Sequence, residues 1–344
     1  MKMKKLAAIV TTAAVALGLA ACGSSASSTA ESSAAESSVE SSTEESSTEE
    51  SSTTDSGKTY KIGFSDFSLS AEYQAKLRDK FVASVADLFG DSAEVIVVDG
   101  ESDSDTQNSG IDNLIAQQCD AIVIVPFDAE QQIPAVQACI DANIPCFEVC
   151  LQTADDDLRT SFIGSDDTTS GEMAMQYMAD QLDGKGNIVY LHGPTGQDSE
   201  IKRHTGANNV VDQYEDMQVV GEYVCNWDRA EAMTAIENVL QSGQTVDGIF
   251  CENDEMALGA YAAIQGTENE GKILITGVDG IGDALTAIKD GNMLCTSFQD
   301  AALQASTTAQ ALKDYFDGKT VEKYYEVPYQ LITAENVDDP YWAE

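Results

Sequence analysis

Short apolar runs rich in β-branched residues recur between residues 60 and 298. They lie at residues 60–64, 94–98, 121–125, 144–149, 187–191, 219–224, 248–251, 273–276 and 293–298. Stretches with helical periodicity, such as 72–89 and 130–143, separate them. Apolar runs that alternate with helices roughly every 25–35 residues indicate βαβ units and parallel sheets buried on both faces. We therefore expect an α/β fold with two doubly wound parallel-sheet lobes, because the runs suffice for two open sheets.

The first 57 residues do not follow this pattern. Residues 1–5 form a basic head, residues 6–21 are an apolar core too short to span a bilayer comfortably, and Leu19-Ala20-Ala21-Cys22 resembles a bacterial lipobox. We predict a lipoprotein signal peptide at 1–21 and lipidation of Cys22; an ordinary secretory signal with a chance cysteine is the alternative. Residues 22–57 are almost only Ser, Thr, Ala and Glu after the cysteine, which predicts a disordered tether. The expected location is extracytoplasmic, at the outer face of the cell membrane. The long acidic tether and the expected lack of disulfides suggest a Gram-positive cell.

The net charge and the cysteines limit which partners, disulfides and metal sites this chain can have. The formal net charge of −41 disfavours binding to nucleic acid or to anionic membrane surfaces, so the membrane contact should be the lipid anchor alone. Eight cysteines in an exported chain would ordinarily indicate disulfides. Seven are left once Cys22 carries lipid, and most lie in apolar patterns, so we expect buried thiols. No CxxC spacing occurs and the chain has 2 histidines, so we expect neither a metal site nor a cofactor.

An ordered set of local patterns resembles the ribose-type, or type 1, periplasmic sugar-binding proteins. The resemblance covers about residues 61–336 and rests on YKIGFSD, DAIVIVPFD, ANIPC, IGSDD, NWDRAEAM, ENDEMALGAYAAI, ITGVDG and CTSFQD, in that order. It implies two lobes joined by a three-crossing hinge, with ligand bound between them. The N-terminal lobe would comprise 58–164 plus 300–325, the C-terminal lobe 165–299 plus 326–344, and helix 301–316 would pack on the N-terminal lobe. Repressors that share this fold carry a DNA-binding headpiece where this chain has a signal and a tether, so a transcription factor is excluded.

Polar residues at strand ends of the second lobe match the family's ligand-contacting positions. In open parallel sheets, ligands lie beyond the carboxyl ends of the strands. The resemblance places Asn253 and Asp279 there, and Gln299 at the second crossing, where an amide contacts ligand. Helix capping is the alternative for Asn253 and Asp279, and a hinge hydrogen bond for Gln299. Asp254 is expected to cap the following helix, which would leave Asn253 free to face the crevice.

Three further residues of the second lobe are ligand-binding candidates. The resemblance gives Trp227 a position where an aromatic ring stacks on the ligand, with a core role as the alternative. Arg203 matches a recurrent arginine near the start of a helix; an internal ion pair is the alternative. Gln197 lies in a loop, PTGQDSE, that could reach the ligand.

The first lobe departs from the family pattern. After its fourth strand the chain has Cys150, and then Leu151, where a polar or charged pair is common in sugar binders. After its first strand it has the segment 66–74 where an asparagine and paired aromatic residues are usual. Phe67 and Tyr73 can still supply ring faces, and Asp66 or Glu148 could supply a carboxylate. A carboxylate at Glu148, within an apolar strand, is costly unless it is paired or used.

These observations predict a solute-binding lipoprotein of an ABC importer. It would bind a monosaccharide or similar small polyol by hinge closure, act as a monomer, and deliver the ligand to a permease and an ATPase. No nucleophile–base pair stands out in the sequence, so we do not expect an enzyme. A subunit that presents ligand to a membrane sensor is an alternative, and a lipid-anchored enzyme on the same fold is a weaker one. The reshaped first lobe leaves the identity of the sugar open.

Overall fold

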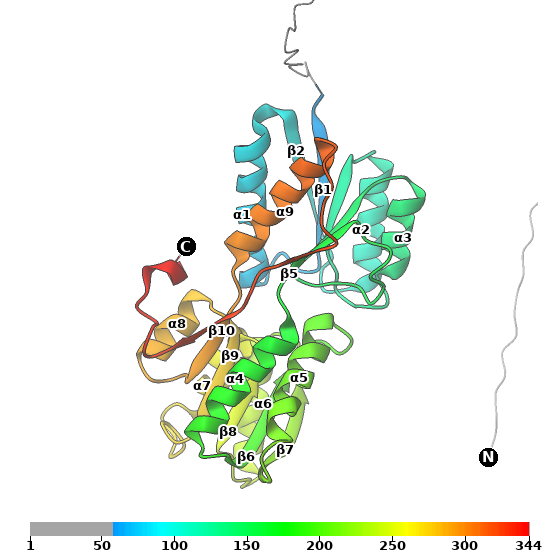
Figure 1. Cartoon of the computed structure of the whole chain (residues 1–344). Coiled ribbons are helices and arrows are strands. Elements are labelled where there is room, and N and C mark those ends of the chain that lie inside the picture. The colour runs from blue at the N-terminus through cyan, green and yellow to red at the C-terminus, as the bar shows by residue number, and fades with distance from the viewer. Residues whose placement is uncertain (1–57, 344) are drawn as a thin grey trace, which may run out of the picture. The chain divides into compact units, whose positions relative to one another are not determined.

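The computed structural model describes residues 58–343, which lie within one compact unit. The predicted signal peptide, Cys22 and the predicted tether all lie outside the described residues. Two six-stranded sheets, each flanked by helices, form two lobes (Figure 1). The expected α/β fold with two parallel-sheet lobes is confirmed. Among the described helices, none combines the length and the apolar character needed to cross a membrane.

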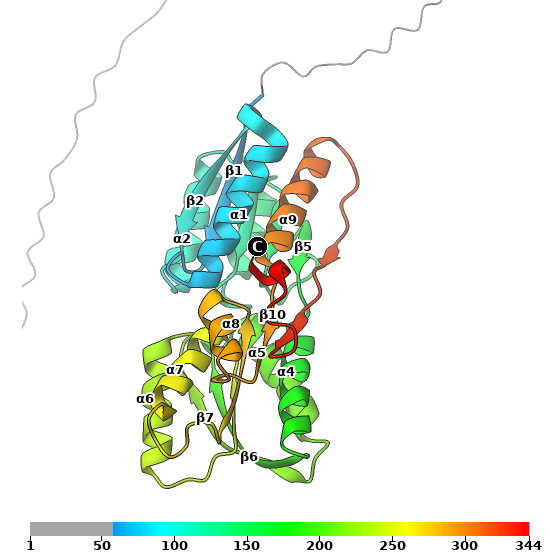
Figure 2. The same cartoon turned by 90° about the vertical axis from the view of Figure 1, so that its left-hand side faces the viewer.

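The N-terminal lobe is built on a sheet with the strand order β11-β5-β4-β3-β1-β2. Its strands are β1 (Tyr60–Asp66), β2 (Ala93–Asp99), β3 (Ala121–Val125), β4 (Cys146–Val149), β5 (Ser161–Gly164) and β11 (Tyr324–Glu326), all paired in parallel. Its helices are α1 (Glu72–Phe89), α2 (Ser104–Ala116), α3 (Ile133–Asp141) and α9 (Ala301–Phe316), with a short 3-10 turn, η1 (Gly90–Ser92). Helices α1 and α9 lie side by side in both views (Figure 1, Figure 2). The predicted packing of helix 301–316 on this lobe is therefore confirmed.

The C-terminal lobe is built on a sheet with the strand order β12-β10-β9-β8-β6-β7. Its strands are β6 (Lys185–His192), β7 (Asp216–Val224), β8 (Gly248–Cys251), β9 (Leu274–Asp279), β10 (Cys295–Phe298) and β12 (Gln330–Thr333). Only β12 pairs antiparallel among the described strands of this sheet. The helices are α4 (Asp167–Gln181), α5 (Asp198–Val211), α6 (Arg229–Gln241), α7 (Asp254–Ile264) and α8 (Gly282–Lys289), followed near the C-terminus by η2 (Pro340–Ala343).

The chain passes between the two sheets three times. It leaves the first sheet after β5, returns after β10, and crosses again between β11 and β12. Three strands were not expected from the sequence: β5, β11 and β12. Each has three or four residues, so none contains a long apolar run. Their extended conformation depends on hydrogen bonds to the neighbouring strand.

The cores on both faces of both sheets are apolar. In the N-terminal lobe Phe64, Leu77 and Phe81 pack on one face, and Ile111, Leu114 and Ile122 on the other. The seven described cysteines are free thiols, and all are buried. Trp227 packs against a core cluster of each lobe. The two cores thus meet at this indole.

Candidate functional site

A cavity of about 40 Å³ lies between the lobes. Residues that end or directly follow β1, β4, β8, β9 and β10 line it, so it sits where the carboxyl ends of the parallel strands meet. Nine of the eleven predicted ligand-binding residues contribute to its wall. They are Phe67, Tyr73, Cys150, Gln197, Arg203, Trp227, Asn253, Asp279 and Gln299.

A second cavity, of about 350 Å³, adjoins the first. The residues that it shares with the first cavity are Phe67, Ala71, Tyr73, Trp227, Asn253 and Asp279. Its other walls are polar, with Glu72 and Arg229 on opposite lobes. The shared residues therefore stand between a small space and a larger, more polar one.

The N-terminal wall is mostly apolar. Phe67 and Tyr73 supply rings, and the Tyr73 hydroxyl donates to Gln304 Oε1 at 3.2 Å. Burial raises the pKa of the Cys150 thiol well above its usual range, so the thiol is neutral. Gln299 Nε2 lies 3.4 Å from Cys150 Sγ. Gln74 also lines this wall, and its Oε1 is buried with no hydrogen-bond partner among the described residues.

The C-terminal wall is organised around Arg203, which is 4 % exposed. Its Nε donates to Asp167 Oδ1 at 2.8 Å, its Nη1 to the carbonyl of Glu252 at 2.6 Å and its Nη2 to the Tyr329 hydroxyl at 3.1 Å. The Tyr329 hydroxyl in turn donates to Asp167 Oδ1 at 2.6 Å. Asp167 follows the first crossing and Tyr329 lies in the third, so Arg203 joins both crossings to α5. The guanidinium therefore lines the cavity and also forms the internal ion pair that the sequence analysis gave as the alternative to ligand binding.

Asp279 faces the cavity from the end of β9. Burial raises the pKa of its carboxyl well above the usual range, and the charge of Arg203 opposes that shift. Arg203 Nη1 lies 3.8 Å from Asp279 Oδ1. The backbone of Asp279 has φ of 124°, an uncommon conformation for a residue with a side chain. Strain of this kind persists where the surrounding structure enforces it, and it is frequent at binding sites.

Trp227 and Gln197 form one unit of the wall. The indole Nε1 donates to Gln197 Oε1 at 2.5 Å, which leaves the buried Gln197 Nε2 without a partner among the described residues. The Arg203 guanidinium lies 5.7 Å from the centre of the indole ring. The ring packs so closely on Gly193 that a Cβ there would lie 2.0 Å from it. The indole is thus fixed in orientation before any ligand binds.

The structure corrects the expected roles of Asn253 and Asp254. Asn253 is the N-cap of α7, with its Oδ1 accepting from the Met256 backbone N–H at 2.9 Å. Asp254 does not cap the helix. It is fully buried, and its Oδ2 accepts from the N–H groups of Gly280 and Ile281 at 2.7 and 3.0 Å. Asn253 still lines the cavity, and its amide nitrogen is not used by the cap. Asp254 instead ties α7 to the turn after β9, because its carboxylate is directed into the lobe.

Asp66 and Glu148 do not line the cavity. Glu148 accepts from the Thr153 hydroxyl at 2.6 Å and pairs with Arg159 at 3.2 Å, so its cost in an apolar strand is offset within the lobe. Asp66 is fully buried at the end of β1 and accepts from the Ser68 N–H at 3.2 Å. The prediction that either supplies a carboxylate to the ligand finds no support in this placement.

Sequence reasoning missed several residues of the site. Gln74, Leu151 and Ser199 line the cavity without having been predicted, and Asp167 and Tyr329 hold Arg203. Gln74 stands next to the predicted Tyr73, and the start of a helix after a parallel strand was the available indication for it. The partners of Arg203 come from the crossings, 36 and 126 positions away in sequence, and no local pattern marks them.

Comparison with known proteins agrees with this geometry. The family model described as "Periplasmic binding protein domain" matches residues 62–320. The chain belongs to this family. It is 38% identical over 249 residues to a xylitol-binding protein of Mycolicibacterium smegmatis, covering 71% of this chain and 70% of that protein. It is 32% identical over 278 residues to a ribose import binding protein of Bacillus subtilis, covering 81% of this chain and 88% of that protein.

A solved structure agrees with the chain in fold and in sequence. It is an ABC transporter solute-binding protein from Bacillus halodurans with bound myo-inositol, at a TM-score of 0.79 and 32% identity, with coverage of 83% of this chain and 98% of that one. The expected type 1 periplasmic binding protein fold is confirmed. Members of this family bind solutes and do not turn them over, so the expectation that the chain is not an enzyme is also confirmed.

Proposed function

We propose that this protein is the solute-binding component of an ABC importer and that it binds a small polyol or monosaccharide in the cavity between its lobes. The observation that carries the proposal is a pair of unpartnered polar atoms on opposite walls. Gln74 Oε1 is an acceptor and Gln197 Nε2 a donor, both buried without a partner among the described residues. Buried polar atoms are costly unless paired, and the hydroxyl groups of a polyol can both donate and accept.

The charges around the cavity favour a neutral ligand. Arg203 is already paired with Asp167 and lies near Asp279, so the positive charge in the wall is balanced within the protein. The Trp227 indole and the Phe67 and Tyr73 rings offer apolar faces. Rings for C–H faces with amides and carboxylates for hydroxyls are what a sugar-like molecule requires.

The relatives narrow the choice of ligand class. The names of two relatives specify xylitol and ribose, and the solved neighbour holds myo-inositol. These three compounds are neutral and carry several hydroxyl groups on five or six carbons. A ligand of this class fits the wall described above.

Ligand entry would require the lobes to move. The first cavity, of about 40 Å³, holds only a few water molecules, so it must widen for a sugar to contact both Gln74 and Gln197, whereas the adjoining cavity of about 350 Å³ already has room for a small ligand. The three crossings are the segments that can act as hinges. Ligand that contacts both walls would shift the population toward the closed form, and the closed form would dock on the permease.

The anchor completes the proposal. Lipidation of Cys22 would hold the protein, as a monomer, at the outer face of the cell membrane, with residues 23–57 as a tether. Cys22→Ala should release the protein from the membrane fraction without changing ligand affinity. Unchanged membrane retention would contradict the anchor and leave the binding proposal untouched.

A thermal-shift screen tests the function. Sugars, polyols and nucleosides are added singly to the protein, with xylitol, ribose and myo-inositol in the first set. A ligand at a hundred times its dissociation constant stabilises the native state by about 2.7 kcal/mol, which raises the melting temperature measurably. A shift with at least one polyol or monosaccharide is expected. A shift with nucleosides or other classes alone would contradict the proposed ligand class, and no shift with any compound would contradict the proposal as a whole.

A further inference from the structure

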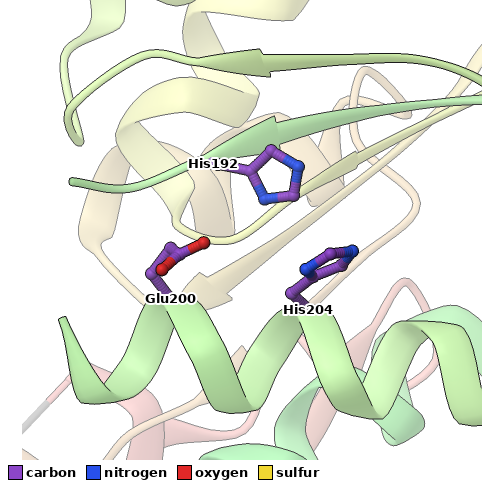
Figure 3. Close-up of side chains that lie close together, drawn as sticks. All are labelled: His192, Glu200 and His204. Atoms are coloured by element: carbon purple, nitrogen blue, oxygen red, sulfur yellow. The ribbon is translucent and has the colours of Figure 1, made fainter. Parts of the chain in front are cut away.

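The two histidines of the chain, 12 positions apart in sequence, meet in the C-terminal lobe. His192 ends β6 and His204 lies on α5, and their ring centres are 4.9 Å apart. Glu200 lies one helical turn before His204, so both side chains project from the same face of α5. Figure 3 shows Glu200 and His204 on the helix, with the His192 ring opposite them. Two imidazoles and a carboxylate are thereby gathered at one edge of the sheet.

The atoms that could bind a metal converge. One ligand atom from each of His192, Glu200 and His204 lies within 4.8 Å of the others. Glu222, on the neighbouring strand β7, adds a second carboxylate. Its Oε2 is 3.1 Å from His192 Nε2 and 3.5 Å from His204 Nε2. Metal–ligand bonds of about 2.0–2.2 Å place ligand atoms a little over 3 Å apart, so small side-chain movements would close this set around an ion.

A buried carboxylate already orients one of the imidazoles. Glu252 is fully buried, and its Oε1 lies 2.8 Å from His192 Nδ1 while its Oε2 accepts from the Gly193 N–H at 2.8 Å. A carboxylate on one ring nitrogen fixes the tautomer that leaves the other nitrogen free to bind metal. In that tautomer the Nε2 lone pair of His192 faces a Glu222 oxygen, an arrangement that a cation between them would stabilise.

We propose that His192, His204 and Glu200, with Glu222 in the fourth position, form a binding site for one divalent transition-metal ion with the ligand preferences of Zn²⁺. Two imidazoles with two carboxylates suit zinc and its neighbours, whereas calcium and magnesium prefer oxygen ligands alone. The sequence indicated no metal site, because Glu200 and His204 alone are spaced as neighbours on one helix, while His192 and Glu222 come from two separate strands.

The site has a structural route to the ligand cavity. The Glu252 side chain holds His192, and the Glu252 carbonyl accepts from Arg203 Nη1 at 2.6 Å. A bound metal would therefore steady the segment that carries Asn253 and positions Arg203. This role is separate from sugar binding, since none of the four ligands lines the cavity.

Calorimetric titration of the metal-free full chain with ZnCl₂, in the absence of sugar, tests the proposal. One equivalent should bind, and Co²⁺ should give the visible spectrum of a tetrahedral site. His204→Gln and Glu200→Gln should each weaken Zn²⁺ binding tenfold or more, and Glu252→Gln should weaken it about 10–100-fold by releasing His192. Asp212→Asn, at an exposed carboxylate that follows α5, is the matched control and should bind as wild type does.

Two results would overturn the site. One is the absence of saturable Zn²⁺ binding to the wild-type chain. The other is Zn²⁺ binding that His204→Gln and Glu200→Gln leave unchanged, which would assign the ion to the acidic surface. Circular dichroism and melting of each metal-free variant establish that the fold is intact. Neither negative result would bear on sugar binding, because no sugar is present in the titration.

Discussion

The two walls of the cavity differ in how their polar groups are held. On the C-terminal wall, Arg203 has three hydrogen-bond partners, and Asn253 is fixed by a helix cap. On the N-terminal wall, Phe67 and Cys150 offer apolar surface and a neutral thiol. Each wall keeps one buried polar atom unpaired among the described residues, Gln74 Oε1 on this wall and Gln197 Nε2 on the other. The C-terminal wall is therefore arranged before ligand arrives, and its polar groups also stabilise the lobe. The polar groups of the N-terminal wall contribute less to the stability of the fold. Residues of this wall can therefore be substituted to suit a different ligand at a smaller cost in stability.

The largest expected effect is on the charged network of the C-terminal wall. Arg203→Met should lower the free energy of unfolding by about 3–5 kcal/mol, because it leaves the buried Asp167 carboxylate without a charged partner and with the Tyr329 hydroxyl as its remaining side-chain donor among the described residues. Arg229→Met is the matched control. Arg229 pairs with Glu255 and Asp283 at the surface, where an ion pair contributes about 0–1 kcal/mol. Urea unfolding without ligand measures both, and equal losses would contradict the assignment of the stabilising network to Arg203.

The next effect concerns a buried carboxyl of the N-terminal lobe. Burial raises the pKa of Asp66 from 3.8 to about 7. A raised acid pKa means that the folded state holds the proton more tightly than the unfolded state. Its contribution to stability is thus complete below the unfolded pKa and is lost as the pH rises from about 4 to about 7. Since one pKa unit corresponds to about 1.4 kcal/mol, the wild type should be more stable at pH 5 than at pH 7.5 by more than about 1 kcal/mol.

Asp66→Asn should reduce that difference in stability, since the amide does not titrate. Asp91→Asn, at an exposed position of the same lobe, should leave it unchanged. Burial also raises the pKa of Glu148 and Glu252 to about 7, so part of the dependence should persist in the Asp66 variant. Thermal melts at both pH values decide the matter. A wild type that is equally stable at pH 5 and pH 7.5 would count against the buried, protonated carboxyl.

The third effect separates helix capping from ligand binding on the C-terminal wall. Asn253→Ala should lower the free energy of unfolding by about 0.5–2 kcal/mol through loss of the α7 cap. It should also weaken ligand binding by about 1–3 kcal/mol through loss of an amide in the cavity. Asp103→Ala removes the cap of α2, which accepts from the Thr106 N–H at 2.8 Å, and should lower stability without changing affinity. If Asn253→Ala lowered stability but left ligand affinity unchanged, as Asp103→Ala should, the Asn253 amide would not contact the ligand.

Much of the fold could be predicted because its cause is local. The run at 121–125 is apolar throughout, and the structure has a fully buried strand with the same bounds. The helix at 72–89 likewise matches α1, since an amphipathic pattern of that length has few other solutions, while helix 301–316, which the family resemblance implied, matches α9. Strand β5 escaped prediction because its four residues, Ser161–Gly164, owe their conformation to parallel pairing with β4 and β11.

The site was predictable where a residue's position along a strand fixes its direction. Asn253 and Asp279 had to meet at the carboxyl edge of one sheet, and they do. The sequence could not distinguish Asn253 from Asp254 as the cap, because both residues can accept from a first helical turn. The close approach of Asp254 to Gly280 and Ile281 decides it, and that contact spans 26 and 27 positions. Glu148 was uncertain for a similar reason, since its partner Arg159 lies beyond the end of its strand.

Calorimetric titration of Gln74→Leu with the ligand found by screening tests the central claim most directly. Gln74 Oε1 has no protein partner among the described residues, so the change should leave the melting temperature of the ligand-free protein no lower than that of wild type. Gln137→Leu, on α3 and outside the cavity, is the matched control and should bind as wild type does. The account predicts that Gln74→Leu loses affinity tenfold or more, about 1.4 kcal/mol, with the fold intact. Wild-type affinity in Gln74→Leu would contradict a ligand held between these two walls.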